Sequence, residues 1–173
     1  MEKNGKRSLV NIVKYEIILW ALWLLRSIPG QIGCYVRRSF FNIGKKVNIW
    51  ENVIIDFPSR LVVGDNTSIN RNCILNCGGG IEIGKNVLIG PNVVIYSQNH
   101  NFSDKSKLIN NQGYSYSKVV IEDNVWIGSG ATILPGSYIE NGAVIGAGTI
   151  VSRKVEANTV NYDKRLRVVK KIS

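Results

Sequence analysis

Residues 119–155 read VVIEDNVWIGSGATILPGSYIENGAVIGAGTIVSRKV, and an aliphatic residue occupies every sixth position of this stretch. The same period of six runs through three earlier blocks of the chain. An α-helix has 3.6 residues per turn and would scatter such side chains around its axis, so helices are excluded here. The aliphatic positions are Ile43, Ile49, Ile55, Val63, Ile69, Leu75, Ile83, Ile89, Ile95, Ile121, Ile127, Ile133, Ile139, Ile145 and Val151.

A period of six predicts a short strand followed by a sharp corner. The aliphatic side chain points inward from the strand, and four residues later the corner accepts only a small or β-branched side chain. Three such hexads return the chain to its start, about 4.8 Å further along the axis. The sequence therefore predicts about five coils over residues 43–157. The second inward positions are Val47, Val53, Thr67, Cys73, Val87, Val93, Val125, Ala131, Ser137, Ala143, Thr149 and Val155.

The repeat has one long interruption, between Ile95 and Ile121. The insertion is polar and lacks inward aliphatic residues, so we expect a protruding loop over residues 99–118. Loops of this length in a compact domain are usually functional or disordered. His100, the single histidine of the chain, stands where this loop leaves the repeat. A lone histidine is more often structural than catalytic, but this position favours the catalytic interpretation.

The charge of the chain is concentrated at its two ends. The net charge is +10, with nine Lys/Arg against two Glu over residues 1–46 and a basic tail over residues 158–173. A nucleic-acid binder would place its basic residues on the folded body, so no nucleic-acid partner is expected. Basic ends favour anionic lipid headgroups or a phosphorylated ligand, and solvated tails are the alternative.

The N-terminal segment, residues 1–42, is expected to be amphipathic and helical. Its apolar run, Ile17 to Leu25, is only nine residues long, whereas a bilayer span needs about 20. Two interpretations stay open, and both can hold. The segment either lies on a membrane surface or covers the open end of the repeat. In the first case Trp20, Trp23 and Leu24 lie at headgroup depth, and Arg26, Arg37 and Arg38 reach lipid phosphates.

The cysteines Cys34, Cys73 and Cys77 are odd in number and have no disulfide spacing. With no secretory cleavage site visible, free thiols and a cytoplasmic location are expected, with the membrane-surface interpretation placing the chain on the inner face of the cytoplasmic membrane. One histidine and no CxxC motif make a metal site improbable. Cys73 lies at an inward corner position and is expected to be a small buried thiol. The role of Cys77 stays open.

The hexapeptide pattern resembles that of the left-handed parallel β-helix acyltransferases. Residues 86–100 (NVLIGPNVVIYSQNH) and residues 124–153 look like the galactoside, maltose and surface-polysaccharide O-acetyltransferase branch, and the match is specific across residues 81–155. This resemblance implies a mainly β fold, acetyl-CoA as co-substrate, a saccharide acceptor and a homotrimer. It also implies that His100 is the general base that removes the proton from the attacking hydroxyl, a task that suits a neutral imidazole.

The resemblance assigns further residues by position. Asn76 matches an asparagine near the reacting groups, although a corner asparagine in a left-handed conformation would look the same. Trp126 would flank the acetyl-CoA site, Ser129 and Ala147 would contact its pantetheine, and Ser152 and Arg153 would lie further along. Glycines at 128, 146 and 148 either admit the ligand or merely form corners. Arg167 and Lys170 would attract the nucleotide phosphates.

One feature departs from the family pattern. Asp163, Lys164 and Arg165 replace the Gly-x-Pro turn that usually precedes the basic tail, which leaves the adenine end of the site undefined. The leading hypothesis is an enzyme that O-acetylates a surface-polysaccharide precursor. The alternatives are transfer to a small soluble acceptor such as serine or a free sugar, N-acetylation of an amino sugar, and a β-helix scaffold without catalysis.

Overall fold

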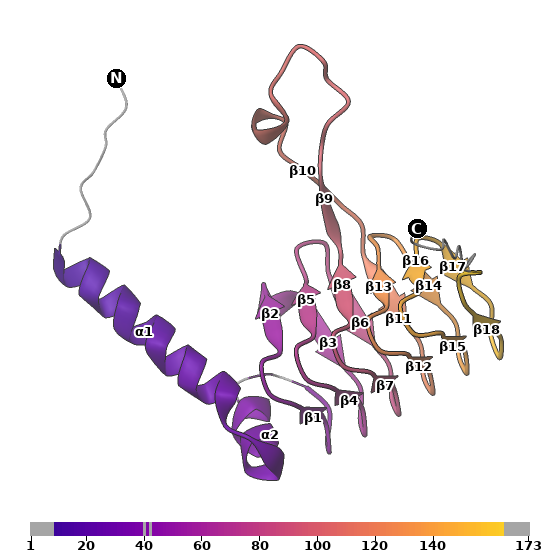
Figure 1. The fold of residues 1–173 in the computed structure, drawn as a ribbon, viewed down its shortest axis with the longest axis horizontal. Helices are drawn as coiled ribbons and strands as arrows, with labels where there is room; N and C mark the ends of the chain where they lie inside the picture. The colour runs from indigo at the N-terminus through magenta and orange to yellow at the C-terminus, as the bar shows by residue number, and fades with distance from the viewer. Residues whose placement is uncertain (1–8, 40, 42, 165–173) are drawn as a thin grey trace, which may run out of the picture.

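The computed structural model describes residues 9–39, 41 and 43–164, which form two helices followed by a parallel β-helix (Figure 1). Three parallel sheets form its faces, here called A, B and C. Face A contains β1 (Asn48–Ile49), β4 (Ser68–Ile69), β7 (Leu88–Ile89), β12 (Trp126–Ile127), β15 (Val144–Ile145) and β18 (Val160–Asn161). Face B contains β2 (Ile54–Asp56), β5 (Ile74–Asn76), β8 (Val94–Tyr96), β13 (Thr132–Ile133) and β16 (Ile150–Val151). Face C contains β3 (Leu61–Val63), β6 (Ile81–Ile83), β11 (Val119–Ile121), β14 (Tyr138–Ile139) and β17 (Lys154–Val155).

The chain therefore makes five complete coils, and β18 begins a sixth. The predicted end of the repeat at residue 157 is too early, because the backbone N–H of Val144 donates to the carbonyl of Thr159 and extends the ladder to β18. The predicted inward positions are confirmed. Those from the second coil onward are at most 4% exposed. Ile43 and Ile55, at the open end, are partly buried.

The corners explain two recurrent residue types. Asparagine or glycine in the left-handed region precedes many of the small inward residues, as Asn92 (φ 59°) precedes Val93 and Gly130 (φ 68°) precedes Ala131. Gly128 has no such backbone angle, but an added Cβ would lie 2.6 Å from the backbone nitrogen of Ala147 in the next coil. Close stacking of coils is therefore enough to require this glycine.

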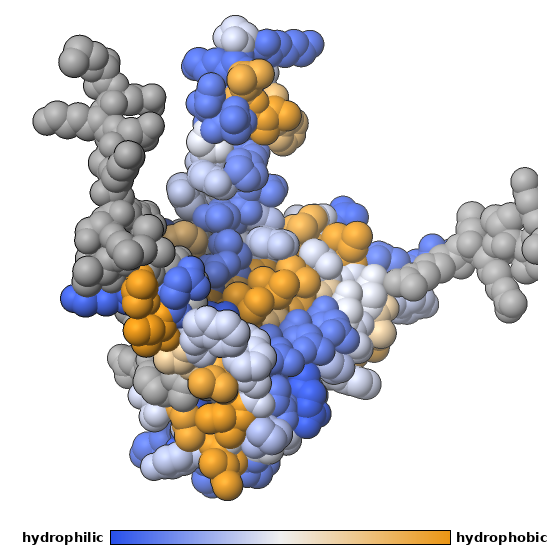
Figure 2. All heavy atoms as spheres, turned by 60° about the vertical axis from the view of Figure 1, so that its left-hand side comes forward, coloured by the Kyte–Doolittle hydropathy of each residue, from blue (hydrophilic) through white to orange (hydrophobic). Residues whose placement is uncertain are grey.

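The insertion in the third coil is a hairpin rather than an irregular loop. Strands β9 (Gln98–His100) and β10 (Tyr114–Tyr116) pair antiparallel and project from the β-helix (Figure 1). A 3₁₀ turn at Ile109–Asn111 lies near the tip; a second, Pro58–Arg60, precedes β3. Figure 2 shows a hydrophobic group near the end of this otherwise hydrophilic projection, where the exposed large apolar residues are Phe102, Leu108 and Ile109.

Helices α1 (Leu9–Ser27) and α2 (Gly30–Arg38) precede the first coil. Helix α2 covers the open end of the β-helix and packs against β1. The covering role was expected of the apolar run Ile17–Leu25, which lies in α1 instead. Its Arg37 is 4% exposed and donates hydrogen bonds from Nε to the carbonyl of Ile49 (2.7 Å) and from Nη1 to that of Ile28 (2.7 Å). The prediction that Arg37 reaches lipid phosphates is therefore wrong, because its guanidinium joins the helices to the first coil.

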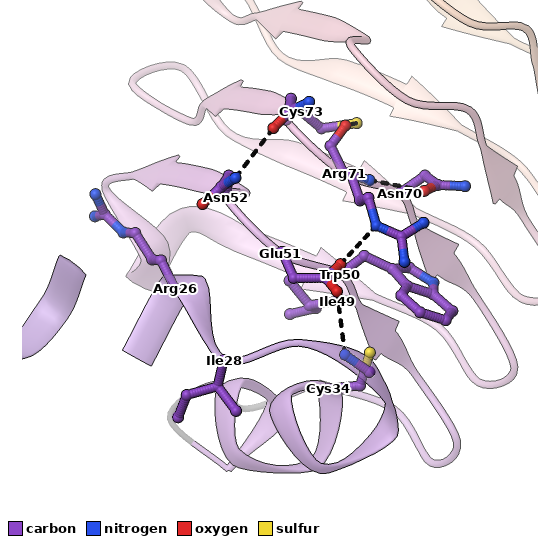
Figure 3. Close-up of polar contacts among 12 residues, drawn as sticks. Arg26, Ile28, Cys34, Ile49, Trp50, Glu51, Asn52, Asn70, Arg71 and Cys73 are labelled. Atoms are coloured by element: carbon purple, nitrogen blue, oxygen red, sulfur yellow. Dashed lines mark hydrogen bonds and ion pairs between the residues drawn. The ribbon is translucent and has the colours of Figure 1, made fainter. Parts of the chain in front are cut away.

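The same end of the β-helix holds a second polar cluster (Figure 3). Glu51 accepts a hydrogen bond from the backbone N–H of Gly30 at 3.1 Å. It also forms an ion pair with Arg71, whose Nε lies 2.8 Å from its carboxylate. The guanidinium of Arg71 also lies over the ring of Trp50, 4.7 Å from its centroid. These contacts fix the start of α2 on the first two coils.

Helix α1 extends away from the β-helix (Figure 1). Trp20, Trp23 and Leu24, predicted to be available to a membrane surface, are each about 60% exposed. Within the residues that the structure describes, no helix has the length and apolar character needed to cross a bilayer.

Candidate active site

The candidate active site lies at the BC corner, the edge of the β-helix where face B turns into face C. Asp56, Asn76 and Tyr96 end successive strands of face B and are stacked in register. The chain then leaves the third coil through β9, which carries His100. The hairpin therefore starts directly above a column of polar side chains, and this is why the only imidazole of the chain lies at this edge.

His100 is exposed and belongs to the ordered stem of the hairpin. It pairs with Tyr114 across β9 and β10, and the two ring centroids are 4.3 Å apart with planes inclined by 40°. No residue of the described part of the chain hydrogen-bonds to the imidazole nitrogens of His100. The imidazole lines a hollow of the surface, and Tyr114 limits the orientation of the ring.

Asn76 lies in the same hollow as His100. Its Oδ1 accepts a hydrogen bond from the backbone N–H of Gly78 at 3.2 Å, and its Nδ2 donates to Asp56 at 3.4 Å. Asn76 does not adopt a left-handed backbone, so the alternative explanation as a corner asparagine fails. The hollow has a volume of about 400 Å³ and is lined by Asn76, Tyr96, Gln98, Asn99, His100 and Tyr114.

Three of the residues assigned to acetyl-CoA lie away from this corner. Trp126 is on face A and is 55% exposed, beside Leu88 and Val144 of the neighbouring coils. Ser129 and Ala147 occupy the AB corner, the edge between faces A and B, where Ser129 Oγ donates to the carbonyl of Pro91 at 3.0 Å. One chain therefore does not bring these residues to His100, because the width of face B separates the two corners.

Ser152 and Arg153 follow β16 and lie at the BC corner, in a hollow of about 230 Å³ at the C-terminal end. The carboxylate of Asp163 accepts a hydrogen bond there from the backbone N–H of Ile150 at 3.0 Å. Asp163 thus satisfies a donor that the incomplete sixth coil leaves open on face B. The predicted phosphate-binding residues Arg167 and Lys170 lie outside the described residues.

The two cysteines near the site are fully buried. Burial raises the pKa of Cys73 to about 11 and, together with the charge of Asp56, raises the pKa of Cys77 to about 12. A nucleophilic thiol needs the opposite shift. The prediction for Cys73 is confirmed, and Cys77 is resolved as a second structural thiol. Over residues 9–39, 41 and 43–164, no group of three His, Cys, Asp or Glu side chains could hold a metal ion.

Sequence reasoning missed the aromatic residues of the hairpin. Tyr114 and Tyr116 are exposed, lie on one strand and alternate with Ser115, which puts both rings on one face of the ribbon. The sequence feature that could have revealed them is the alternating YSY of residues 114–116, which pairs with QNH of residues 98–100. These two short strands lie within a segment that is otherwise typical of a polar loop.

Two family models match the chain. The bacterial transferase hexapeptide (six repeats) matches residues 118–153, and the hexapeptide repeat of succinyl-transferase matches residues 60–97. Together they cover the repeat on either side of the hairpin and leave out the hairpin, the first two strands and the last two strands. The fold and its repeats thus define a β-helical transferase of the hexapeptide class.

Several relatives narrow this class. The galactoside O-acetyltransferase of Lactococcus lactis is 33% identical and aligns with 87% of this chain and 67% of that protein. WbbJ of Escherichia coli, named provisionally as an O-acetyl transferase of lipopolysaccharide biosynthesis, is 29% identical over 98% of this chain and 91% of its own length. A provisionally named acetyltransferase of Saccharomyces cerevisiae is 40% identical over 68% of this chain, which spans only 59% of the yeast protein.

Solved structures agree with these relatives. A maltose O-acetyltransferase from Clostridium difficile 630 superimposes with a TM-score of 0.75 and 36% identity, covering 93% of this chain and 88% of that one. A galactoside acetyltransferase in complex with coenzyme A gives a TM-score of 0.72 and 27% identity, covering 97% and 86%. The chain therefore belongs to the hexapeptide-repeat acetyltransferase family.

Proposed function

We propose that the protein transfers an acetyl group from acetyl-CoA to a hydroxyl of a saccharide, with His100 as general base. The observation that carries this proposal is the position of His100, exposed in a hollow beside Asn76 at the root of the hairpin. The names of the relatives supply the donor and the acceptor class. WbbJ, which aligns with nearly the whole chain, favours a surface-polysaccharide precursor as acceptor.

The proposed reaction needs only one proton carrier. A ring nitrogen of His100 takes the proton of the acceptor hydroxyl while the oxygen attacks the thioester carbonyl. The tetrahedral intermediate collapses to the acetyl ester, and the departing thiolate receives the proton from the imidazolium. A hydrogen bond from the Asn76 amide or from a backbone N–H would stabilise the negative oxygen of the intermediate.

Acetyl-CoA supplies the activated acyl group, and the AB corner offers residues that would hold it. Trp126 presents an exposed indole, and the corner beside it carries only small side chains, Ser129 and Ala147, so an extended chain such as pantetheine can approach the backbone. Ser152 and Arg153, assigned to the same ligand, lie on the other edge, at the C-terminal end of the BC corner. Arg153 is exposed, which leaves its guanidinium available to a phosphate.

The separation of the two corners supports a homotrimer. Within one chain, His100 lies at the BC corner, whereas Trp126, Ser129 and Ala147 lie at or beside the AB corner. Packing the BC corner of one copy near the AB corner of the next would join them, and three-fold closure would repeat this contact three times. Face A also exposes an apolar column that includes Leu88, Trp126 and Val160. Light scattering during gel filtration tests this assembly, and a monomer with full activity would contradict it.

Acetyl transfer is tested by incubating the purified protein with radiolabelled acetyl-CoA and a panel of acceptors. The panel contains galactosides, maltose, glycosyl phosphates, an amino sugar and serine. We expect an alkali-labile acetyl ester on a saccharide, because esters hydrolyse in mild base and amides do not. An alkali-stable product on the amino sugar would indicate N-acetylation instead. No transfer to any acceptor would favour a scaffold.

We further propose that α1 places the protein on an anionic membrane surface. Val13, Ile17, Trp20 and Leu24 follow spacings of three and four residues and form one exposed stripe, beside which Trp23 packs edge-to-face on Trp20. The nine apolar residues between Glu16 and Arg26 extend over about 14 Å of helix, which reaches into one leaflet only. Every copy carries a surplus of seven positive charges over residues 1–46, which favours anionic lipid over another copy as the occupant.

Vesicle co-sedimentation tests this docking surface. The full chain should bind vesicles that contain phosphatidylglycerol and should bind pure phosphatidylcholine much more weakly. Replacing Trp20 and Trp23 together by alanine should release it. Phe102→Ala, which removes an even more exposed aromatic ring from the hairpin, is the control and should bind normally. The lipid-binding proposal would be rejected if the double variant bound the vesicles as well as the wild type. It would also be rejected if the substitutions changed the size of the oligomer instead of vesicle binding.

A further inference from the structure

The hairpin presents a row of rings that leads away from His100. Residues paired across antiparallel strands share one face of the ribbon, so the pairs His100–Tyr114 and Gln98–Tyr116 lie on the same side. The ring centroids of His100 and Tyr114 are 4.3 Å apart, and those of Tyr114 and Tyr116 are 6.4 Å apart. Both tyrosines are about half exposed. Their faces form a platform that continues beyond the candidate active site.

This platform ends over a second hollow of about 660 Å³. Tyr116 lines it together with Arg60, Lys118 and the run of glycines at 78–80. The two hollows adjoin at Gln98 and Gly78. Gln98 lines the first hollow and Gly78 the second, and a Cβ added to Gly78 would lie 2.0 Å from Gln98 Oε1. A ligand longer than one sugar can therefore occupy both.

The charges in the second hollow are not balanced. Lys118 is paired with Glu82. Arg60 donates one hydrogen bond from Nη1 to the carbonyl of Gly78, and its guanidinium lies 5.9 Å from the ring centroid of Phe57. Within the part of the chain that the structure describes, no carboxylate forms an ion pair with Arg60. The remaining N–H groups of its planar fork suit an oxyanion, and phosphate matches that geometry.

We propose that this second hollow is an acceptor subsite for a phosphate ester. The acceptor is then a glycosyl phosphate whose reacting hydroxyl lies at His100, whose sugar rests on Tyr114 and Tyr116, and whose phosphate binds Arg60. This inference rests on the proposed acetyl transfer and names its substrate class. A nucleotide-linked and a lipid-linked sugar both carry the required phosphate. A neutral glycoside lacks it and would leave Arg60 without its ligand.

Binding can be measured without catalysis. Isothermal calorimetry on the full chain should show that galactose 1-phosphate and N-acetylglucosamine 1-phosphate bind at least about tenfold more tightly than their methyl glycosides. Arg60→Gln should remove this difference and leave the affinity for the methyl glycosides unchanged. Arg60→Lys keeps the positive charge but lacks the planar guanidinium, so it should retain part of the difference in affinity. Lys85→Gln, an exposed charge at the CA corner, the edge between faces C and A, is the matched control.

The tyrosine platform has its own prediction. Tyr116→Ala should lower the affinity for the phosphorylated and the neutral sugars alike. Tyr116→Phe should keep both affinities, because stacking needs the ring and not the hydroxyl. Equal affinity for the phosphorylated and neutral probes, or a preference for phosphate that persists in Arg60→Gln, would overturn the subsite. The proposal would also be overturned if the wild-type protein bound none of these probes.

The kinetic experiment separates this inference from the proposed function. Wild-type protein that acetylates methyl glycosides as efficiently as glycosyl phosphates would refute the subsite and leave acetyl transfer standing. Binding of glycosyl phosphates through Arg60 without any acetyl transfer would refute the function and leave the subsite standing. UDP-N-acetylglucosamine in solution and a polyprenyl diphosphate sugar in vesicles then distinguish the soluble source of the phosphate from the lipid source.

Discussion

The BC and AB corners are built from the same repeat but differ in what they carry. The BC corner has polar side chains at the ends of its strands and gives rise to the hairpin with His100. The AB corner has small residues, Ser129 and Ala147, beside the exposed indole of Trp126. A regular prism cannot bring two of its own edges together. If His100 is the base and the AB corner holds the acyl donor, as we propose, the two can meet only where two copies pack against each other.

The largest expected effect concerns the BC corner alone. His100→Ala should lower the turnover of acetyl-CoA by about three orders of magnitude, because general base catalysis contributes that much. The thermal unfolding midpoint should stay unchanged, since the exposed ring buries little area. Release of free CoA, followed with a thiol reagent, measures the rate. A variant that retains the wild-type rate would remove His100 from the mechanism.

Mixing two inactive variants tests whether the corners belong to different copies. His100→Ala disables the BC corner, and Ala147→Trp should obstruct the AB corner. If each site joins two copies of a trimer, random mixed trimers should regain about a quarter of the wild-type sites. The variants are denatured together, refolded and assayed against each variant refolded alone. Complete absence of recovery in correctly assembled mixed trimers would place the whole site within one chain.

A smaller effect is expected from Trp126→Ala at the AB corner. Loss of the indole removes apolar contact with the acyl donor, so the KM for acetyl-CoA should rise about fivefold while kcat changes little. Tyr138→Ala, which removes an aromatic ring from face C, serves as the control and should leave KM unchanged. A fall in kcat with constant KM would instead place Trp126 at the reacting atoms.

The smallest effect concerns the interior that both corners share. The pKa values of Cys73 and Cys77 are raised from 9.0 to about 11 and 12 by burial, so the folded state favours the protonated thiols. Their stabilising contribution is complete below pH 9 and is lost as the pH rises through the folded values. Urea unfolding at pH 7.5, 9.0 and 10.5 should show this decline.

Substituting serine at both positions provides the control. Ser97 and Ser137 occupy comparable buried positions in other coils, so the change is tolerated by the fold and removes the titration. The double variant Cys73→Ser, Cys77→Ser should lose stability less steeply above pH 9 than the wild type. An identical decline would show that the thiols are not its cause.

The fold could be predicted because the hexapeptide repeat specifies each inward residue locally. Ile127 and Ala131, for example, are recognised from spacing alone and are both buried. The hairpin could not, because its pairing of His100 with Tyr114 joins residues 14 positions apart and has no counterpart in the repeat. Arg37 was misplaced for a similar reason. Its partners are backbone carbonyls of Ile28 and Ile49, which no sequence pattern reveals.

The site was predicted only in part. A histidine at the root of an insertion can be found from sequence, and the asparagine one coil below it follows from the family pattern. Arg60 and Tyr116, the residues of the proposed phosphate subsite, could not be found, because they line one hollow only after the first three coils stack and the hairpin returns over them. Their residue types are unremarkable where they stand in the sequence.

The stacking of the coils fixes distances along the axis of the β-helix in multiples of one coil. Each coil adds about 4.8 Å along the axis and contacts only its neighbours, so inserting or deleting one whole coil shifts everything beyond it by a fixed step without disturbing the packing on either side. The hairpin leaves the third coil, and Asp163 ends face B above the fifth. Two increments therefore set how far the His100 level lies from the C-terminal hollow, and evolution can adjust that distance to a longer or shorter ligand only in whole steps.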